Sequence, residues 1–445
     1  MGKDNKRFQK KTLLITGIFV LLLVVTVILY KRLVVEVTSI SLEQENVMIE
    51  IGEKIVLDGE ITPKNATDWI LDWSSADESI ATVTSSGEVS AVAAGTTSIT
   101  VQVANSKKRA ACTVIVPVAF NDEEFEKQIR LLIGKPEGPI YKTNLEGITS
   151  LRLSGENITD INGIENFIDL EVLSIRFTNV SDIHALEGLV NLTDLDLGDN
   201  QISDLDSLSE LVNLNVLRLG GNNINDISPL RNLTSLTWLD LHSNEITDID
   251  ALIGLIHLTQ LELSLNRIND ISAVAGLNEL TYLDMMSNNI SDITPLDTLN
   301  HLQKLVLYGN QINDISALSG MKGLISLILD NNAISDITLL AGLTSLRSLS
   351  LGYNAISDIS ALTNLPDLLS LYLNNNNITD ITALENVKNL QNLDISFNVV
   401  SDISPLAALS KLTSLNLKNN QIRNVDVLTE MTSLLYVDVT NNPIE

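Results

Sequence analysis

A repeat of 22 residues constrains this chain more than any other feature. From Ile148 to Ser433 one pattern runs through thirteen full units, and a truncated fourteenth unit ends at Glu445, with no insertion or deletion. We number the places of every unit as in Leu192 to Asn213, LTDLDLGDNQISDLDSLSELVN. Leucine or isoleucine fills places 1, 4, 6, 11, 14, 17 and 20 with few exceptions.

A single unit is too small to fold alone, because its few buried aliphatic side chains do not offset the entropy lost on ordering the whole unit. Units that stack can bury these side chains against each other, which predicts a solenoid with one continuous core. Only 4% of the residues are aromatic, so leucine and isoleucine must fill that core.

Asparagine occupies place 9 in twelve successive units. A chain that turns away from a strand leaves backbone N–H and C=O groups unpaired, and an amide side chain can both accept from them and donate to them. We therefore predict an asparagine ladder that joins successive coils, formed by Asn200, Asn222, Asn244, Asn266, Asn288, Asn310, Asn332, Asn354, Asn376, Asn398, Asn420 and Asn442. Glu156 and Thr178 replace asparagine in the first two units, so the ladder should be weaker there.

The second half of each unit carries turn and capping signals. Ser, Thr, Asp or Asn fills place 15 in twelve of thirteen units, sometimes followed by proline as in Ser228-Pro229, which predicts a short capped helix or 3₁₀ segment at the back of each coil. Aspartate recurs at place 13 in twelve of thirteen units, from Asp160 to Asp402. Only one carboxylate per unit lies there and no glycine-rich loop accompanies it. Hydrogen bonding in the turn therefore explains this aspartate better than bound calcium, and we predict no metal site.

The strand of each unit predicts the surface that is free for function. Since side chains alternate along a strand, places 4 and 6 point inward and places 3, 5 and 7 form the concave surface. Aromatic and acidic residues gather at these places. Aromatic side chains surrounded by polar groups are what a protein-binding hot spot needs, although tyrosine also simply suits strands. The candidate partner-binding residues are Trp238, Asp240, His242, Glu262, Tyr282, Asp284, Val306, Tyr308, Ile328 and Tyr372, with Tyr353 at place 8 on the rim. The acidic excess predicts a protein partner with a basic patch.

An enzyme would need reactive groups on this surface. Of the four histidines only His242 lies at a concave place, and the chain has no nucleophile motif, paired metal-binding histidines or phosphate-binding glycine loop. Asp240 with Glu262 or Asp284 could in principle act on a glycoside. Acidic residues on repeated strands are far more often a solvated surface, so we expect neither an enzyme nor a cofactor.

The N-terminus has the pattern of a membrane anchor. Leu13 to Tyr30 contains no charged residue over 18 residues, and at about 1.5 Å per residue it spans roughly 27 Å, close to the core of a bilayer. More basic residues precede this segment than follow it: Lys3, Lys6, Arg7, Lys10 and Lys11 lie before it, and Lys31 and Arg32 lie after it. This bias predicts a cytoplasmic tail over residues 1–12 and an extracellular main body. A cleaved signal peptide is the alternative, but the following YKRLVVEVTS offers no small-residue cleavage pattern.

Charge and cysteine content exclude two further possibilities. The formal charge is −28 although the first 32 residues are basic, which argues against nucleic acid as a partner of the main body. Cys112 is the only cysteine, so no internal disulfide can form. The fold must depend on burial and hydrogen bonds.

Residues 37–117 resemble a known domain family. In this segment β-branched residues alternate with polar residues between glycines. It resembles the bacterial immunoglobulin-like domain of group 2, and the resemblance is carried by the stretches DWSSADESIATVTSSGEVSAVAAGTTSITV and ACTVIV. The resemblance implies an antiparallel β-sandwich with Trp73 in its core. It also implies a role as a spacer or adhesion module.

The repeat pattern NxIxDIxxLxxL, over residues 148–445, resembles the internalin type of leucine-rich repeat. The resemblance implies a parallel concave sheet and a helical N-terminal cap over residues 118–147, where Phe125, Ile129, Leu132 and Ile133 have helical spacing. We therefore predict a membrane-anchored surface protein of a Gram-positive bacterium, whose repeats bind a protein on a host or neighbouring cell. The alternative is a non-adhesive structural component of the envelope. The repeats end without a cap, which fits a longer natural chain, a frayed last coil or a docked partner. A C-terminal wall-sorting signal is also missing, so the N-terminal helix is the only anchor that we expect from the sequence.

Overall fold

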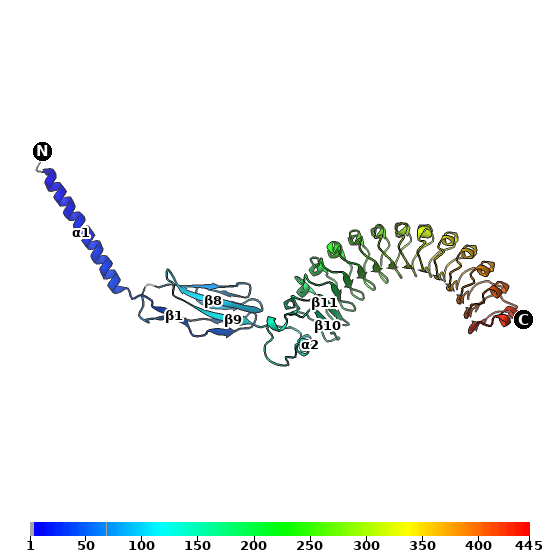
Figure 1. Cartoon of the computed structure of the whole chain (residues 1–445), viewed down its shortest axis with the longest axis horizontal. Helices are drawn as coiled ribbons and strands as arrows, with labels where there is room; N and C mark the ends of the chain where they lie inside the picture. Colours follow the sequence, from blue (N-terminus) through cyan, green and yellow to red (C-terminus); the bar gives the residue numbers. More distant parts are fainter. Residues whose placement is uncertain (1–3, 68) are drawn as a thin grey trace. The chain divides into compact units, whose positions relative to one another are not determined.

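The computed structural model describes residues 4–67 and 69–445, so Lys3 of the predicted basic tail lies outside the described residues (Figure 1). The chain divides into two compact units. One comprises Met1–Ala119 and Arg130–Leu145, and the other comprises Phe120–Ile129 and Glu146–Glu445.

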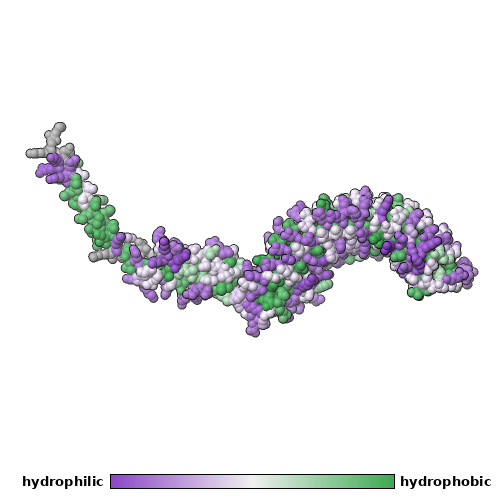
Figure 2. Space-filling view, in the orientation of Figure 1, coloured by the Kyte–Doolittle hydropathy of each residue, from purple (hydrophilic) through white to green (hydrophobic). Residues whose placement is uncertain are grey.

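The apolar N-terminal segment forms one helix, α1 (Asp4–Leu33). Lys6–Lys31 within it has a peak mean hydropathy of 3.0 and no buried residue, and Figure 2 shows this helix as hydrophilic at its N-terminal end and apolar beyond it. The hydroxyls of Thr12 and Thr16 donate to the backbone carbonyls four residues earlier, so these polar groups are satisfied inside the helix. The helix is long and apolar enough to cross a membrane, a property that signal sequences share.

The following β region consists of short strands in three sheets. The strands are β1 (Ser39–Leu42), β2 (Asn46–Met48), β3 (Lys54–Val56), β4 (Gly59–Thr62), β5 (Leu71–Ser75), β6 (Ala81–Val83), β7 (Glu88–Ala91), β8 (Gly95–Val103) and β9 (Arg109–Val116). The sheets have the orders β1-β4, β2-β9-β8-β5 and β3-β7-β6. The prediction of a purely antiparallel fold is wrong at one pair, because β2 runs parallel to β9.

The core of this region contains Cys112, which is fully buried and free. Trp73 packs against both hydrophobic clusters of the region, whereas Trp69 is largely exposed. Gly87 has φ +83°, and a Cβ there would lie 2.9 Å from the Trp73 ring, so glycine permits the close packing of that ring.

Helix α2 (Glu123–Ile133) precedes the repeats, and η1 (Lys142–Asn144) follows it. Asp122 Oδ1 accepts from the backbone N–H of Phe125 at 2.9 Å, and Asp122 Oδ2 accepts from the backbone N–H of Thr159 at 2.9 Å. One carboxylate therefore caps the helix and ties it to the first coil. Phe125 and Ile129 are buried as predicted, but Leu132 is 50% exposed and does not belong to the packed face.

The repeats form a solenoid with one parallel sheet of fourteen strands in sequence order. The strands are β10 (Ser150–Ser154), β11 (Val172–Arg176), β12 (Asp194–Asp196), β13 (Val216–Arg218), β14 (Trp238–Asp240), β15 (Gln260–Glu262), β16 (Tyr282–Asp284), β17 (Lys304–Val306), β18 (Ser326–Ile328), β19 (Ser348–Ser350), β20 (Ser370–Tyr372), β21 (Asn392–Asp394), β22 (Ser414–Asn416) and β23 (Tyr436–Asp438). Each residue pairs with the residue at the same place of the next unit, as Leu239 does with Leu261. The sheet lines the inner side of the arc and short helices line the outer side (Figure 1).

The outer segments are single turns, as predicted. They are η2 (Ile164–Asn166), η3 (His184–Leu186), η4 (Asp206–Leu208), η5 (Ser228–Asn232), η6 (Asp250–Leu252), η7 (Ser272–Val274), η8 (Thr294–Leu296), η9 (Ser316–Gly320), η10 (Thr338–Gly342), η11 (Ser360–Asn364), η12 (Thr382–Asn386), η13 (Ser404–Ala408) and α3 (Asp426–Glu430). The capping residue differs from the prediction. The place 15 hydroxyl does not cap the turn; the place 13 carboxylate accepts the backbone N–H of place 15, as Asp226 does from Ser228 at 2.8 Å. Aspartate at place 13 is thus an architectural residue.

The asparagine ladder is confirmed. Asn376 Nδ2 donates to the carbonyls of Leu373 in its own coil and Leu351 in the preceding coil, at 3.0 and 2.9 Å. Its Oδ1 accepts from the backbone N–H of Ile356 at 2.9 Å. At the start of the ladder the hydroxyl of Thr178 donates to Asn200 Oδ1. Every ladder asparagine therefore links its coil to the one before it.

Candidate functional site

The concave surface consists of the outward residues of β10–β23. In a typical strand the middle residue is buried and the residues on both sides are partly exposed, as in Trp238, Leu239 and Asp240 of β14. Aliphatic residues thus fill the interior, and places 3, 5 and 7 point to the concave surface.

The predicted partner-binding residues lie on this surface with one exception. Trp238 and Asp240 lie in β14, Glu262 in β15, Tyr282 and Asp284 in β16, Ile328 in β18 and Tyr372 in β20; His242 and Tyr308 follow β14 and β17, and Tyr353 lies on the rim. Val306 is only 6% exposed, so the prediction that it offers contact area is wrong.

Charge pairs join the first strands of the surface. Arg218 in β13 donates to Asp194 Oδ1 at 2.8 Å, and its guanidinium lies 4.1 Å from the centre of the Trp238 ring. Arg176 in β11 donates to Asp199 Oδ2 at 2.8 Å. Both arginines are therefore already engaged within the protein.

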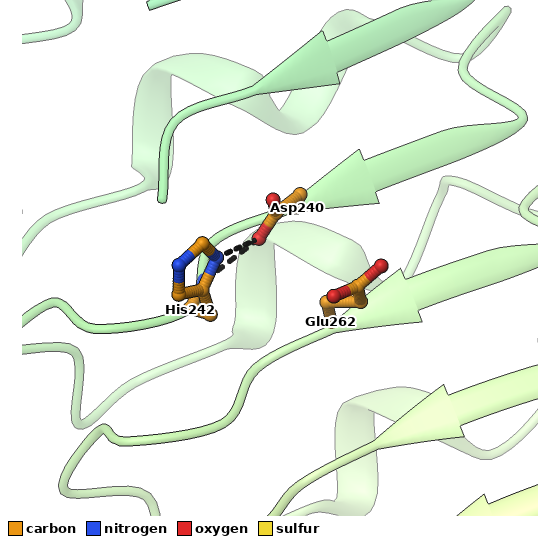
Figure 3. Close-up of side chains that lie close together, drawn as sticks. All are labelled: Asp240, His242 and Glu262. Atoms are coloured by element: carbon orange, nitrogen blue, oxygen red, sulfur yellow. Dashed lines mark hydrogen bonds and ion pairs between the residues drawn. The ribbon is translucent and has the colours of Figure 1, made fainter. Parts of the chain in front are cut away.

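Three carboxylates lie side by side in the next strands. The sheet register pairs Asp240 with Glu262 and Glu262 with Asp284. Burial raises the pKa of Glu262, and the charges of Asp240 and Asp284 raise it further. His242 Nδ1 lies 2.7 Å from Asp240 Oδ1, and this hydrogen bond raises the pKa of His242 (Figure 3). The imidazole thus lies close to two of these carboxylates, Asp240 and Glu262.

Lys304 in β17 is directed toward an aromatic ring. Its Nζ lies 4.7 Å from the centre of the Tyr282 ring. The Tyr282 hydroxyl donates to Asp284 Oδ2 at 3.3 Å, and burial followed by the charges of Asp284 and Glu262 raises the pKa of Tyr282. The hydroxyl therefore stays protonated and can serve as a donor.

Serine and asparagine dominate the concave places of β18–β22. Asp330, two residues after β18, is only 9% exposed, and its Oδ1 accepts from Ser350 Oγ at 2.7 Å and from Gly352 N at 3.0 Å. Burial raises the pKa of Asp330, and the two hydrogen bonds offset only part of this effect. A Cβ on Gly352 would lie 2.8 Å from Asp330 Oδ1, so glycine makes room for the carboxylate.

Place 8 forms the rim of the surface and is left-handed in every unit. From Phe177 to Asn441 its φ lies between +53° and +70°. Glycine and asparagine tolerate this conformation, whereas bulky side chains are strained in it. Four bulky residues nevertheless hold it and are exposed, namely Phe177, Leu265, Tyr353 and Phe397. Strained and exposed apolar residues favour a role in contact rather than in folding.

Sequence reasoning missed the strain at Leu265 and the burial of Asp330. Asp330 lies at place 7, so strand alternation could have placed it on the concave surface. Its burial depends on Ser350 and Gly352 one unit later, and a pattern within one unit does not show this.

Comparisons with known proteins agree with this geometry. The model for leucine-rich repeats in two copies matches residues 168–210, 190–232, 212–254, 278–320, 300–342, 322–364, 344–386, 366–408 and 388–430, and a second leucine-rich repeat model matches 234–290. An internalin (InlF) from Listeria monocytogenes is 35% identical with a TM-score of 0.71, over 72% of this chain and 96% of the internalin. The chain is an internalin-like leucine-rich repeat protein.

Two further relatives extend the description of this internalin-like protein. A leucine-rich repeat protein of Leptospira interrogans is 25% identical with a TM-score of 0.64, over 68% of this chain and 86% of that one. The bacterial Ig-like domain (group 2) model matches residues 36–114. An Ig-like virion protein of Serratia phage KSP90 is 39% identical over 84 residues, which are 19% of the internalin-like protein and a third (33%) of the phage protein.

Proposed function

We propose that this internalin-like protein is a cell-surface receptor or adhesin, anchored by α1, that binds a protein partner on its concave surface. The observation that carries the proposal is the composition of the concave places, where aromatic rings lie among carboxylates while the inward places are aliphatic. Aromatic side chains surrounded by polar groups are typical of binding hot spots. Asp240, Glu262 and Asp284 favour a partner with a basic patch.

A photo-crosslinker at position 372 tests the surface directly. The full-length protein, displayed on cells, is irradiated with other cells or their surface extracts, and the captured proteins are identified by mass spectrometry. A crosslinker at position 297, on the convex side, is the matched control. We expect capture of the same protein from 372 and not from 297. Equal capture from both positions, or from neither, contradicts the proposal and favours a structural role in the envelope.

Charge reversal then tests the chemistry of the partner. Glu262→Lys with Asp284→Lys should weaken binding of the captured protein by about 2 kcal/mol or more, roughly 30-fold in Kd, because hot-spot changes have this size. Asp297→Lys changes the charge of an exposed convex residue and should leave Kd unchanged. An equal loss of affinity in both variants would show that the change in net charge weakens binding, and not the loss of a contact on the concave surface.

Anchoring by α1 needs a separate measurement. Protease added to intact cells should remove the repeats and leave a fragment containing α1 in the membrane fraction after alkaline extraction. Release of the whole chain by alkaline extraction would contradict the anchor and favour a cleaved signal.

A further inference from the structure

Asp240, His242 and Glu262 come close enough to share one ion. Each offers one ligand atom, and these atoms lie within 4.8 Å of one another. Within the described part of the chain this is the one group of three histidine, cysteine or carboxylate residues that does so. We propose that these three residues form a binding site for a divalent first-row transition metal such as Zn²⁺.

The site is built by three adjacent coils. A Cβ at Gly220, one unit before His242, would lie 2.1 Å from the His242 ring, so the ring occupies space that only glycine leaves free. Asp240 Oδ1 also holds this residue in place, through His242 Nδ1 at 2.7 Å and the His242 backbone N–H at 3.0 Å. Glu262 comes from the next strand. The imidazole is therefore positioned before any ion binds, which lowers the entropy cost of binding.

The local charge favours a cation. Asp240, Glu262 and Asp284 lie in adjacent strands. The basic side chains of the neighbouring coils are bound to other groups, Arg176 to Asp199 at 2.8 Å. Arg218 pairs with Asp194 and lies against Trp238, while Lys304 lies over Tyr282. A divalent ion would supply the positive charge that this group of carboxylates lacks.

The donor atoms select the class of metal. One imidazole nitrogen and two carboxylate oxygens suit zinc and its neighbours, whereas calcium and magnesium prefer oxygen ligands alone. Tetrahedral zinc bonds of about 2.0–2.2 Å place neighbouring ligand atoms about 3.4 Å apart. The most distant pair of ligand atoms, at up to 4.8 Å, must therefore approach on binding, whereas His242 Nδ1 and Asp240 Oδ1, at 2.7 Å, must separate slightly. On binding, the proton between His242 Nδ1 and Asp240 passes to solvent and the metal takes its place. Three protein ligands leave a coordination position open toward the concave surface.

Calorimetry with Zn²⁺ alone tests the site on the full-length protein in detergent, freed of metal by a chelator. We expect one Zn²⁺ per chain, with Mg²⁺ unable to compete. His242→Asn should weaken zinc binding about 100-fold, and Glu262→Gln and Gly220→Ala about 10-fold each. Circular dichroism of each variant separates loss of the site from loss of the fold.

His257→Asn is the matched control, because His257 Nδ1 lies 3.4 Å from Glu279 Oε1 in a second histidine–carboxylate pair that is exposed. This variant should bind zinc like the parent protein. Co²⁺ should give visible absorption bands in the parent protein and the His257 variant but not in the His242 variant. Equal zinc binding by the His242 and His257 variants, or no stoichiometric binding by the parent, would overturn the proposal. Neither result depends on a protein partner, so both leave the proposed function untouched.

Discussion

The two halves of the concave surface share one backbone and differ in chemistry. In the first half, β12–β17, the concave places hold carboxylates, cations and aromatic rings, whereas serine and asparagine predominate in the second half, β18–β22. The strand pairing is nevertheless the same, and Asn266 and Asn376 make equivalent hydrogen bonds in the two halves. Inward places and the ladder determine the fold, so the outward places can change their chemistry without disturbing it.

The largest expected effect tests whether the ladder is equivalent in both halves. Asn266→Ala and Asn376→Ala each remove one acceptor of a backbone N–H and the donor to three backbone carbonyls. The groups left unpaired should lower the free energy of unfolding by about 2–4 kcal/mol. Hydrogen exchange measured by mass spectrometry gives the opening free energy of the flanking strands. The two losses should agree within about 1 kcal/mol. A clearly larger loss in one half would mean that surface chemistry contributes to the fold.

A second prediction concerns the buried carboxylate of the second half. Ser350→Ala removes a hydrogen bond to Asp330 and should destabilise the fold by about 1–3 kcal/mol at pH 7. Burial raises the pKa of Asp330 above its unfolded value, so folding favours the protonated form of this side chain. The destabilisation caused by Ser350→Ala should therefore become smaller as the pH falls through the pKa of folded Asp330 and the carboxylate is neutralised. Urea unfolding at pH 7 and pH 4.5 measures this change. Ser348→Ala lies in the same strand and should have little effect at either pH.

A reciprocal exchange at the rim should give a smaller effect. Leu265 and Asn375 both have φ +57°, but only asparagine tolerates this conformation readily. Leu265→Asn should stabilise the fold by about 1 kcal/mol, and Asn375→Leu should destabilise it by about the same amount. Thermal unfolding measures both. Changes of the same sign would show that exposure, and not backbone conformation, decides the outcome.

The smallest effect should be common to both halves. Hydrogen bonds from place 15 lower the pKa of several place 13 carboxylates, among them Asp292 of the first half and Asp358 of the second. A carboxylate whose pKa is lower in the folded than in the unfolded state stabilises the fold at pH values above its unfolded pKa of about 3.9. This stabilisation is lost as the pH falls through the pKa of the folded state. Tm should therefore fall between pH 5 and pH 3.

A variant controls for this acid sensitivity. Asn424 naturally occupies place 13 and accepts the backbone N–H of Asp426 at 2.7 Å, so asparagine can perform the same role without titrating. Asp358→Asn should keep Tm at pH 6 and reduce its acid-induced fall. An unchanged fall would assign the acid sensitivity to other carboxylates.

The sequence predicted most of the solenoid, because every repeat places the same residue type in the same environment. The sheet, the concave places and the ladder all follow from periodicity. The residue that caps each outer turn could not be predicted from periodicity, because serine at place 15 and aspartate at place 13 are both good hydrogen-bonding residues in a turn. The parallel β2–β9 pair was also missed, since three-residue strands carry too short a pattern to show direction.

The candidate site was predicted less completely. Alternation placed Asp240, His242 and Glu262 on the concave surface, but their approach depends on Gly220 in the preceding unit. Val306 occupies the same place of the repeat as exposed residues of other units, but its own side chain is buried. Contacts between units depend on which two residues meet in neighbouring units, and the repeat pattern describes only the residue type that is common at each place.

The reach of each ladder asparagine has a consequence for how such a protein changes its length over evolutionary time. Asn376 bonds to residues 25 and 20 positions earlier, so its partners are fixed by chain distance. Duplication or deletion of one whole unit of the gene restores every bond of the remaining coils, whereas an insertion of a few residues disrupts the junction where it occurs. The array can therefore grow or shrink only in whole units, each of which changes the length of the concave surface by one strand spacing, about 4.8 Å.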